Sequence, residues 1–430
     1  MKSSEADTVE LRNSRFLITQ SQLRYFGGSE VTTLELAQYL NANAKSVSVF
    51  TYQFDEPIKT VFESVGIDVI VGLDADVHLA DYDYVWVHHQ VLPLQMVLEL
   101  AENPTSKPKF IFMHMSAMKT NSFERPYIFQ LEQKLSGRTL YNSLETKSSI
   151  EADYFQTISP PSSIYPNPAP VEFAELEPIR TETRRIIALI SNHPPVEVLE
   201  ALTLLEHAGW HALRVGMYQG AQVDRVTPGL LAQCDVVISI GKTVQYCLVG
   251  GIPIYVYDHF GGPGYLNDGN FKLAEELNFS GRGFRKKSAK DIFEEIVSGL
   301  SSSREWQQEH QVELNVKFRL DKVLARVLNR VDESNHGNFD PDYVSYLIAA
   351  QRIAADQIRG TLERDDLQRA LAETREESQK ELHSLHARLA KSEQLTESRE
   401  NEINEIHGSA TWRIGRAMLS PLRLLRKSAA

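Results

Sequence analysis

Small residues at a strand-to-helix turn are the first candidates for chemistry. Gly27, Gly28 and Ser29 follow an apolar run at residues 15–19 and precede a helical pattern. Glycines let the backbone approach a ligand closely, and the free N–H groups of a helix start attract an anion such as a diphosphate. Glu30 would suit the same helix start without any ligand. The spacing favours neither an anion site nor a plain turn, and it is not the Gly-x-Gly-x-x-Gly dinucleotide pattern.

Two further segments carry residues suited to phosphate. Lys242 and Thr243 can supply a cation and a hydroxyl donor to a phosphate group, although an exposed turn lysine would give the same pattern. Gly261 and Gly262 lie in a glycine-rich segment directly after an apolar run. Such a segment predicts a loop beside a phosphate or sugar, or else a wide turn capped by Asp258.

Histidines gather at the ends of two apolar runs, as His88, His89 and His114. No suitably spaced cysteine or acidic partner accompanies them, so we expect no metal site. His114 could be a catalytic group on the acceptor side, and a structural histidine is an equal alternative. Cys234 and Cys247 are the only cysteines of the sequence, too few for a disulfide framework or a four-cysteine zinc site.

Short apolar runs alternate with helical patterns along the first two thirds of the chain. The first set of runs covers residues 15–19, 47–51, 67–71, 84–88, 109–113 and 139–141. The second set covers residues 185–190, 213–215, 235–240 and 252–257. Runs of this length suit strands buried on both faces of a parallel sheet. The sequence therefore predicts an α/β fold.

A proline-rich break separates the two sets of runs. Five prolines lie between Ile158 and Pro170, so no helix can pass through this segment. We interpret it as the crossing between two doubly wound α/β domains. In such sheets ligands bind at the carboxyl ends of the strands, and two facing domains leave a cleft there.

The chain continues with a long helical pattern at residues 342–407 and a basic tail. Leu382, Leu385 and Leu389 follow a coiled-coil spacing, but polar residues interrupt the seam. A weak coiled coil that permits self-association and a solvated single helix are therefore both expected. The tail from Ser409 holds five basic residues, Trp412 and no acid. A basic amphipathic end of this kind can lie on an anionic membrane surface, and a frayed end is the alternative.

Composition bounds the remaining choices. The 430 residues carry a net charge of −12, which argues against a nucleic-acid partner. No apolar run is long enough for a transmembrane helix, and Met1–Glu10 does not have the pattern of a secretory signal. We expect a cytoplasmic protein, with peripheral binding to the inner face of the plasma membrane as a further prediction.

The motifs, taken in order, resemble those of GT-B glycosyltransferases of family four. The segments that carry the resemblance are Gly27–Glu30, Asp81–His89, Phe112–His114, Tyr141–Ser143, Ile164–Pro168, Cys234–Ser239 and Gly251–Pro253. Together they span roughly residues 15–285. The tail from Ser409 to Arg423 is similar to an ending that recurs on glycosyltransferases of bacterial cell-surface polysaccharides.

The resemblance implies a nucleotide-sugar-dependent transferase of the hexosyltransferase type, with a glycan or lipid-linked acceptor and no metal or other cofactor. Its domains would be residues 1–165 on the acceptor side, 166–335 for the donor, a helical extension at 336–408 and a tail at 409–430. It implies donor-binding roles for Gly27, Gly28, Ser29, Asn192, Lys242, Thr243, Gln245, Tyr246, Gly261 and Gly262. It also implies acceptor-side roles for His88 and His89, and a catalytic role for His114.

The sequence departs from the family at its carboxylates. Two glutamates usually precede the Gly-Val-Pro turn, whereas Tyr246 stands at the second position here, with Gln245 beside it. The turn around Asn192 lacks the family's basic residues. A catalytically degenerate scaffold of a polysaccharide-assembly complex is therefore an alternative, and a sugar-nucleotide epimerase of the same fold is a third.

Overall fold

The computed structural model describes residues 11–102, 108–119, 124–179, 185–218, 220–334 and 339–427, with backbone alone from residue 419 onward. The expectation for Met1–Glu10 lies outside the described residues, and the side chains of Leu419, Leu422 and Leu425 in the tail are not described either. The chain forms two compact units, Met1–Arg359 and Gly360–Ala430.

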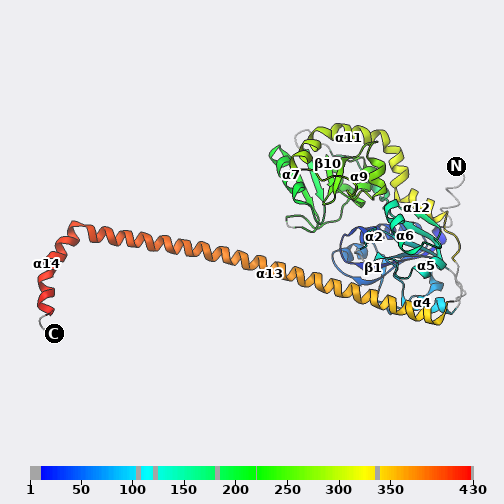
Figure 1. The fold of residues 1–430 in the computed structure, drawn as a ribbon, viewed down its shortest axis with the longest axis horizontal. Helices are drawn as coiled ribbons and strands as arrows, with labels where there is room; N and C mark the ends of the chain where they lie inside the picture. The colour runs from blue at the N-terminus through cyan, green and yellow to red at the C-terminus, as the bar shows by residue number, and fades with distance from the viewer. Residues whose placement is uncertain are drawn as a thin grey trace. The chain divides into compact units, whose positions relative to one another are not determined.

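The first sheet of the larger unit has seven parallel strands in the order β3-β2-β1-β4-β5-β6-β7. Figure 1 draws this part of the chain in blue to cyan. The strands are β1 (Arg15–Leu23), β2 (Ser46–Phe54), β3 (Asp68–Val71), β4 (Tyr84–His88), β5 (Lys109–His114), β6 (Ser136–Tyr141) and β7 (Ser162–Ile164). Between them lie α2 (Gly28–Asn43), α3 (Ile58–Ser64), the 3-10 turn η1 (Leu79–Asp81), α4 (Leu94–Ala101), α5 (Phe129–Leu135) and α6 (Leu144–Tyr154). The order reverses between β1 and β4, as in doubly wound folds.

The second sheet has five strands in the order β12-β11-β10-β8-β9. They are β8 (Arg185–Ile190), β9 (Trp210–Val215), β10 (Val236–Ser239), β11 (Ile254–Asp258) and β12 (Gly261–Tyr265), and only β12 runs antiparallel. The helical elements of this part are η3 (Val171–Phe173), α7 (Val196–His207), α8 (Pro228–Ala232), α9 (Lys242–Gly250), α10 (Phe271–Glu276), α11 (Ala289–Phe318) and α12 (Leu320–Leu328). The predicted pair of doubly wound domains is confirmed.

Two edge strands differ from the sequence-based expectation. The proline-rich crossing contributes β7, because an edge strand needs hydrogen bonds on one side only and its flanking prolines fall outside it. The glycine-rich segment expected to be a loop forms β12 against β11. A Cβ atom at Gly262 would collide with the backbone of Val256 and Tyr257, so the glycine permits this close approach.

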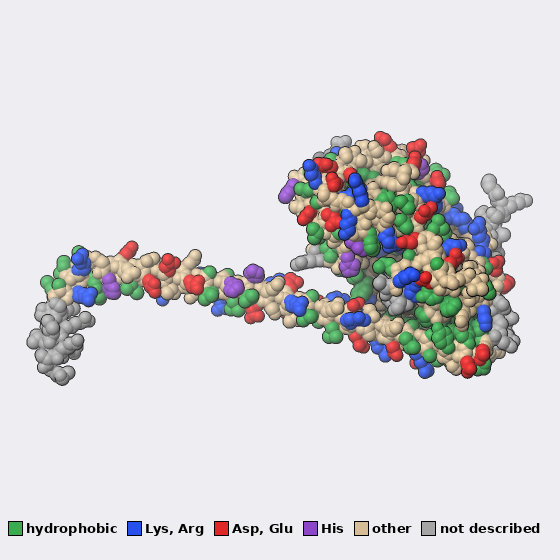
Figure 2. Space-filling model, in the orientation of Figure 1, with side chains coloured by type: hydrophobic (Ala, Val, Ile, Leu, Met, Phe, Trp, Pro, Cys, Tyr) green, Lys and Arg blue, Asp and Glu red, His purple; other side chains and the backbone are tan. Residues whose placement is uncertain are grey.

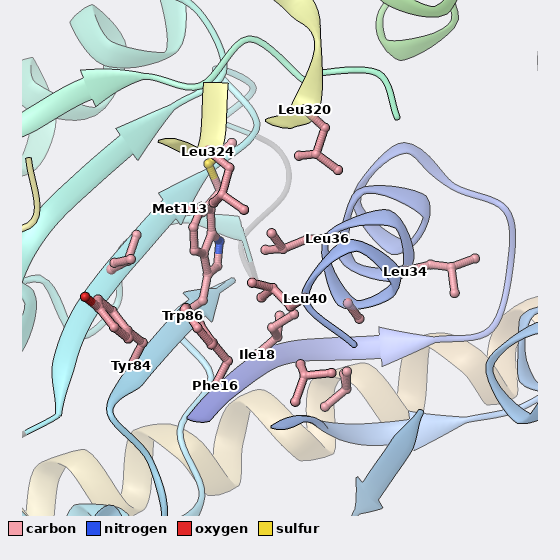
Figure 3. Packing of buried hydrophobic residues seen from close by; sticks show 14 of the residues in the cluster. Phe16, Ile18, Leu34, Leu36, Leu40, Tyr84, Trp86, Met113, Leu320 and Leu324 are labelled. Carbon is pink, nitrogen blue, oxygen red and sulfur yellow. The ribbon is translucent and has the colours of Figure 1, made fainter. Parts of the chain in front are cut away.

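The core of the first domain includes residues from far along the chain. Trp86 on β4 is fully buried beside Met113, and Leu320 and Leu324 of α12 pack against the same cluster (Figure 3). The sequence analysis assigned residues 166–335 to the donor domain. That assignment is wrong for α12, because this helix packs in the core of the first domain. The amphipathic Leu and Val pattern predicts a buried helix face, but it cannot say which core buries that face.

Helix α13 (Pro341–Gly408) begins within the larger unit. Gln351 is fully buried there, donates to the carbonyl of Gln90 at 2.9 Å and accepts from the Leu92 amide at 3.1 Å. The hydroxyl of Tyr52 donates to the same side-chain oxygen. The first turns of this helix thus complete the hydrogen bonding of the loop after β4.

The smaller unit contains the rest of α13 and α14 (Ala410–Lys427). Acidic, basic and hydrophobic side chains intermingle along this part of α13 (Figure 2), and Leu382, Leu385 and Leu389 are each about half exposed. The predicted long helix is confirmed, while its pairing into a coiled coil stays a prediction. No helix among the described residues combines the length and the hydrophobicity that a membrane crossing needs.

Gly262→Ala tests the close packing of β12. The added Cβ meets backbone atoms that cannot swing away, so we expect a loss of about 1–3 kcal/mol, the usual cost of overpacking. The midpoint of thermal unfolding measures it. Gly229→Ala is the matched control, because open space surrounds that position. Equal midpoints for the two variants would contradict the packing.

Candidate functional site

A cavity of about 600 Å³ lies where the carboxyl ends of the two sheets face each other. Turns after β1, β5 and β6 line one wall, and turns after β8, β9, β10 and β11 line the other. The reversal of the second sheet, between β8 and β10, opens onto it, and so does the turn after β1 at the reversal of the first sheet. Doubly wound sheets bind ligands at such points. The fold therefore forms a two-walled site from segments that are distant in sequence.

The wall after β1 carries its own anion. Gly27 precedes α2 in an extended conformation, and Ser29 and Glu30 stand in the first turn. The hydroxyl of Ser29 donates to Glu30 Oε2 at 2.8 Å, and a Cβ on Gly27 would collide with that oxygen. Gly27, Gly28 and Ser29 do line the cavity. The Glu30 carboxylate lies against this turn, in line with the alternative that needs no ligand, and the donor-binding roles of the three residues stay predictions.

The opposite wall has a second helix start, at α9. Gly241 precedes it with φ 58° and ψ −133°, a conformation that favours glycine, and no side chain caps the helix. Lys242 and Thr243 form the first turn, and both line the cavity. The amide groups of this turn carry the positive end of the helix dipole, so this wall presents a helix start of the kind that can attract an anion.

A buried carboxylate of α2 binds the first turns of α9. Glu35, 2% exposed, lies 2.8 Å from Lys242 Nζ, and Tyr246 donates its hydroxyl to Glu35 at 2.5 Å. Arg225 approaches the same carboxylate at 3.5 Å. Lys242 also donates to the carbonyl of Pro168 at 3.0 Å. One carboxylate from the first domain therefore joins three groups of the second.

Burial shapes the ionisation of this cluster. It lowers the pKa of Lys242, and the nearby Glu35 carboxylate opposes that shift. Burial and the same carboxylate raise the pKa of Tyr246, so its hydroxyl stays protonated and donates. Lys242 thus reaches the cavity already neutralised by Glu35. The sequence analysis did not identify Glu35 as the partner of Lys242. The one feature that could have pointed to it is the position of this carboxylate among the apolar residues of a helix face.

The remaining predicted donor residues divide between the cavity and the protein interior. Asn192 lines the cavity after β8, and its side chain accepts from the Met217 amide at 3.2 Å. Tyr246 lines it as well, stacked on Phe173. Gln245 is buried and does not line it.

Gly261 and Gly262 do not line the cavity either, and their expected donor contact stays a prediction. Both belong to β12, and Gly262 borders a separate surface hollow with Arg285 and Lys287. The glycines there allow β12 to pack closely against its neighbours. A glycine-rich sequence looks the same whether it forms such a strand or a phosphate-binding loop.

The three predicted histidines lie beneath the site. His88, His89 and His114 are at most 4% exposed, and none lines the cavity. Burial lowers the pKa of His88 and His89 to about 3, so both are neutral. The three side chains therefore do not reach the cavity in this structure, and their expected acceptor-side and catalytic roles stay predictions. The pattern of a strand-end histidine is the same whether the side chain faces the cleft or the core.

Their partners are internal. His89 Nδ1 lies 2.7 Å from Ser21 Oγ, and His114 Nε2 lies 3.0 Å from the buried Glu132. No group of three or more His, Cys, Asp or Glu side chains in the described ranges is placed to hold a metal ion. Met115 and Ser116, which follow His114, face the cavity in its place.

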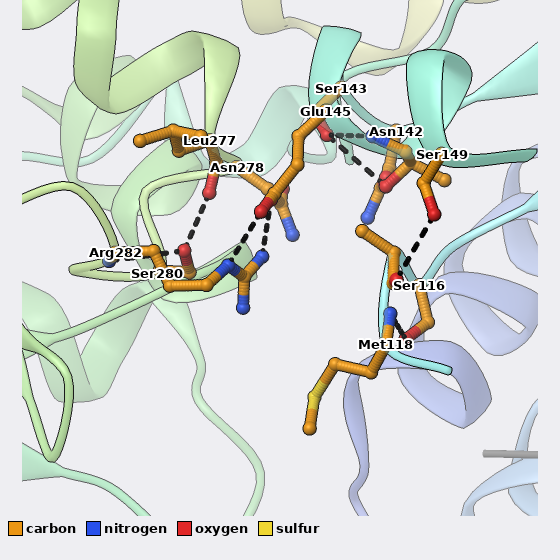
Figure 4. A network of polar contacts seen from close by, with 12 residues as sticks. Ser116, Met118, Asn142, Ser143, Glu145, Ser149, Leu277, Asn278, Ser280 and Arg282 are labelled. Atoms are coloured by element: carbon orange, nitrogen blue, oxygen red, sulfur yellow. Dashed lines mark hydrogen bonds and ion pairs between the residues drawn. The ribbon is translucent and has the colours of Figure 1, made fainter. Parts of the chain in front are cut away.

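Further contacts join the two walls at the rim. Arg282 forms a two-point ion pair with Glu145, with N···O distances of 2.8 and 2.5 Å (Figure 4). Asn167 donates to Asn278 at 3.1 Å. Bidentate arginine–carboxylate pairs fix orientation as well as distance, so these contacts hold the walls at a defined spacing.

Comparison with known proteins agrees with this geometry. No family model matches the chain, and no curated protein matches its sequence. Among solved structures, a glycosyltransferase from Rickettsia africae ESF-5 is 14% identical with a TM-score of 0.50, covering 74% of this chain and 97% of that one. WaaG, a glycosyltransferase involved in lipopolysaccharide biosynthesis, is 11% identical with a TM-score of 0.44, covering 73% and 99%. SsfS6 from Streptomyces sp. SF2575, solved with thymidine diphosphate, is 12% identical with a TM-score of 0.40, covering 74% and 100%.

The likeness to the Rickettsia africae structure concerns the fold. Two doubly wound domains that face a cleft give this chain the GT-B fold, and a long helix follows them.

Glu35→Gln tests the buried cluster. Removing one partner of a buried ion pair leaves the other charge uncompensated, which costs about 3–5 kcal/mol. We expect a clear fall in the thermal midpoint, and partial recovery in Glu35→Leu/Lys242→Met, where neither charge remains. Glu63→Gln is the control, since it breaks an exposed pair with Lys59 worth at most about 1 kcal/mol. A fall no larger than that of the control would contradict the buried pair.

Proposed function

We propose that this protein is a glycosyltransferase that moves a sugar from a nucleotide-sugar donor to a bacterial surface glycan or its lipid-linked precursor. One observation carries the proposal: the cavity between two GT-B domains contains an uncapped helix start, that of α9. Charge that develops on a leaving diphosphate can be stabilised by preorganised N–H groups without a metal ion.

The donor is proposed to bind the wall of the second domain. Its diphosphate lies at Gly241–Thr243, and its nucleoside lies against the turns after β8 and β9, where Asn192 and Met217 line the cavity. The side chain of Thr243 adds a hydroxyl donor to the backbone amides. Because Glu35 neutralises Lys242, backbone N–H groups carry most of the attraction.

The acceptor is proposed to enter along the wall of the first domain. Met115, Ser116, Glu124 and Asn142 line this side, in place of the buried histidines. Hydroxyl, amide and carboxylate groups of this kind suit the hydroxyls of a sugar acceptor.

Gly241→Ala tests the donor site. An alanine there cannot keep φ 58° with ψ −133° without strain, so the first amides of α9 move. Titration calorimetry with UDP, GDP and dTDP is expected to show one tight ligand, and binding at least about tenfold weaker in the variant, a loss of about 1.4 kcal/mol. Gly209→Ala is the strain-matched control, because it also has positive φ in open space but lies outside the cavity. Equal affinities for the two variants would contradict the donor site.

A catalytically degenerate scaffold is the second candidate, and the charge of the cavity favours it. Among described residues, four carboxylates line the cavity against one lysine that is already paired: Glu30, Glu124, Asp224 and Asp258. A scaffold needs no donor, so no binding of any of the three nucleotides to a folded sample would move the assignment to it.

The basic tail is proposed to bind an anionic membrane surface. Trp412, Ile414 and Met418 are exposed on α14, and Arg413 and Arg416 lie between them. Self-association through the exposed leucines of α13 also stays a prediction.

Arg413→Glu/Arg416→Glu tests the membrane contact in the full chain. Each basic residue near an anionic surface contributes about 1 kcal/mol, so we expect at least about tenfold weaker partitioning to vesicles that contain phosphatidylglycerol. Sedimentation with those vesicles measures it, and deletion of residues 409–430 should abolish binding. Arg388→Glu, an exposed site on α13, is the control. Unchanged partitioning of the double variant would contradict the proposal.

A further inference from the structure

The part of α13 that belongs to the smaller unit has an apolar stripe in contact with water. Residues 366–408 are all exposed. The larger apolar residues of the stripe, each about half exposed or more, are Leu367, Leu371, Leu382, Leu385, Leu389, Ile403 and Ile406. Long helices in proteins gain most of their stability by burying one face, so the single chain leaves this stripe unexplained.

The stripe follows the seven-residue repeat of a coiled coil from Leu382 onward. In the usual notation, position a holds Leu382, Leu389, Thr396 and Ile403, and position d holds Leu385, Ser392, Arg399 and Ile406. Before Leu382, the step from Ser378 is four residues where three are due. A coiled coil accommodates such a stutter by local unwinding. The repeat therefore extends back through Thr374 and Leu371 to Leu367.

Polar residues of the seam restrict what can cover it. Ser378, Ser392 and Thr396 would lose water against a wholly apolar partner without gaining a hydrogen bond. Against the same residue of a second copy, each hydroxyl can donate to a hydroxyl. Arg399 can keep its charged end in water at the open side of a two-helix seam while its stem covers the seam. The stripe therefore fits a second copy of itself better than an apolar surface.

The residues that flank the seam are complementary between parallel copies. In a parallel pair, each residue at position g lies opposite the residue five places later on the other helix, and charges at these positions decide orientation. Three of the four pairs match, namely Glu381 with His386, Arg388 with Glu393 and Glu402 with His407, and the fourth is Leu395 with Glu400. Neighbours on one helix are three or four residues apart, so these pairs meet only between copies.

An antiparallel pair fits the stripe less well. Centred between Leu382 and Leu385, it would place Ile403 opposite Arg364 and Leu389 opposite Ser378. A parallel pair in register places every leucine and isoleucine of the stripe against the same residue of the second copy. Because the burial of apolar surface drives association, the stripe favours the parallel arrangement.

We propose that residues 367–407 of α13 pair with a second copy of this chain as a parallel, in-register, two-stranded coiled coil. The self-association expected from the leucine spacing thereby gains an orientation, a register and a stoichiometry. The pairing depends on α13 alone and not on the proposed transfer reaction. Polar residues lower the stability of a coiled coil, so the dimer is reversible and its population depends on protein concentration.

The mass of the full chain in solution tests the pairing. Light scattering after size exclusion, repeated over a range of concentrations, is expected to show a mass that rises from 48.7 kDa toward twice that value. Leu382→Asp/Leu389→Asp places unpaired charges in the seam, so we expect dimerisation at least about a hundredfold weaker. Ala387→Asp/Ala390→Asp is the matched control, because the same charges then lie on the outer face of the helix, and its mass should equal that of the parent.

Oxidative cross-linking tests the orientation. A cysteine in Ile403→Cys faces its own copy only when the helices are parallel and in register, and a disulfide needs Cα atoms within about 7 Å. With oxidised glutathione, we expect a covalent dimer on a non-reducing gel. Ser398→Cys, on the outer face, is the control and should stay monomeric on that gel. Cys234 and Cys247 are buried and should not contribute.

A charge exchange tests the flanking pairs. Glu393→Arg sets two arginines against each other in each of the two symmetric pairs, so we expect dimerisation about tenfold weaker. Arg388→Glu/Glu393→Arg restores opposite charges between parallel copies, and the affinity should return to that of the parent.

Each contrary result overturns a stated part of the proposal. A parent protein that stays monomeric at every concentration overturns the pairing, and so does a dimer that persists in Leu382→Asp/Leu389→Asp. A mass of three or more chains overturns the two-stranded form. A dimer that neither cross-links through Ile403→Cys nor recovers in the charge exchange overturns the parallel register. Nucleotide binding is measured separately, so its failure leaves the pairing standing.

Discussion

The two walls of the site depend on one buried carboxylate. Glu35 rises from α2 of the first domain and binds Lys242 and Tyr246 of α9 in the second. A charge at 2% exposure is tolerated only when it is paired, and here all its charged partners come from the facing domain. The domains cannot separate fully without exposing this cluster to water or leaving a charge unpaired. The same contact holds the first turn of α9, which lines the cavity, against the first domain.

The electrostatic asymmetry of the cavity follows from the two helix starts. No side chain caps either helix start, but at α2 the Glu30 carboxylate lies beside the first turn and accepts from Ser29. Since each helix start attracts one anion, an incoming anion has one vacant position and one repelling neighbour. In the proposed function, this arrangement would orient a diphosphate without the basic side chains that the sequence lacks.

The chain returns to its first domain after completing the second. Helix α12 fills part of the first core, and Gln351 of α13 hydrogen-bonds the loop after β4. His89 and Gln90 of that loop have φ values of 50° and 58°, which residues other than glycine rarely adopt. The hydrogen bonds from Gln351 therefore stabilise an otherwise costly loop conformation beside the site. The larger compact unit thus includes the start of the C-terminal helix.

The sequence by itself determined the local structure. The apolar runs predicted the buried strands, the prolines after Ile158 predicted the break between domains, and the uninterrupted polar pattern predicted α13, because each signal comes from neighbouring residues. The resemblance of ordered motifs added the GT-B fold. Tertiary structure alone decided what the polar residues touch. It buried the histidines, turned the glycines at 261 and 262 into a strand, and brought Glu35 to Lys242 across 207 positions of sequence. Such pairings depend on how two domains pack, and no local spacing in the chain encodes that packing.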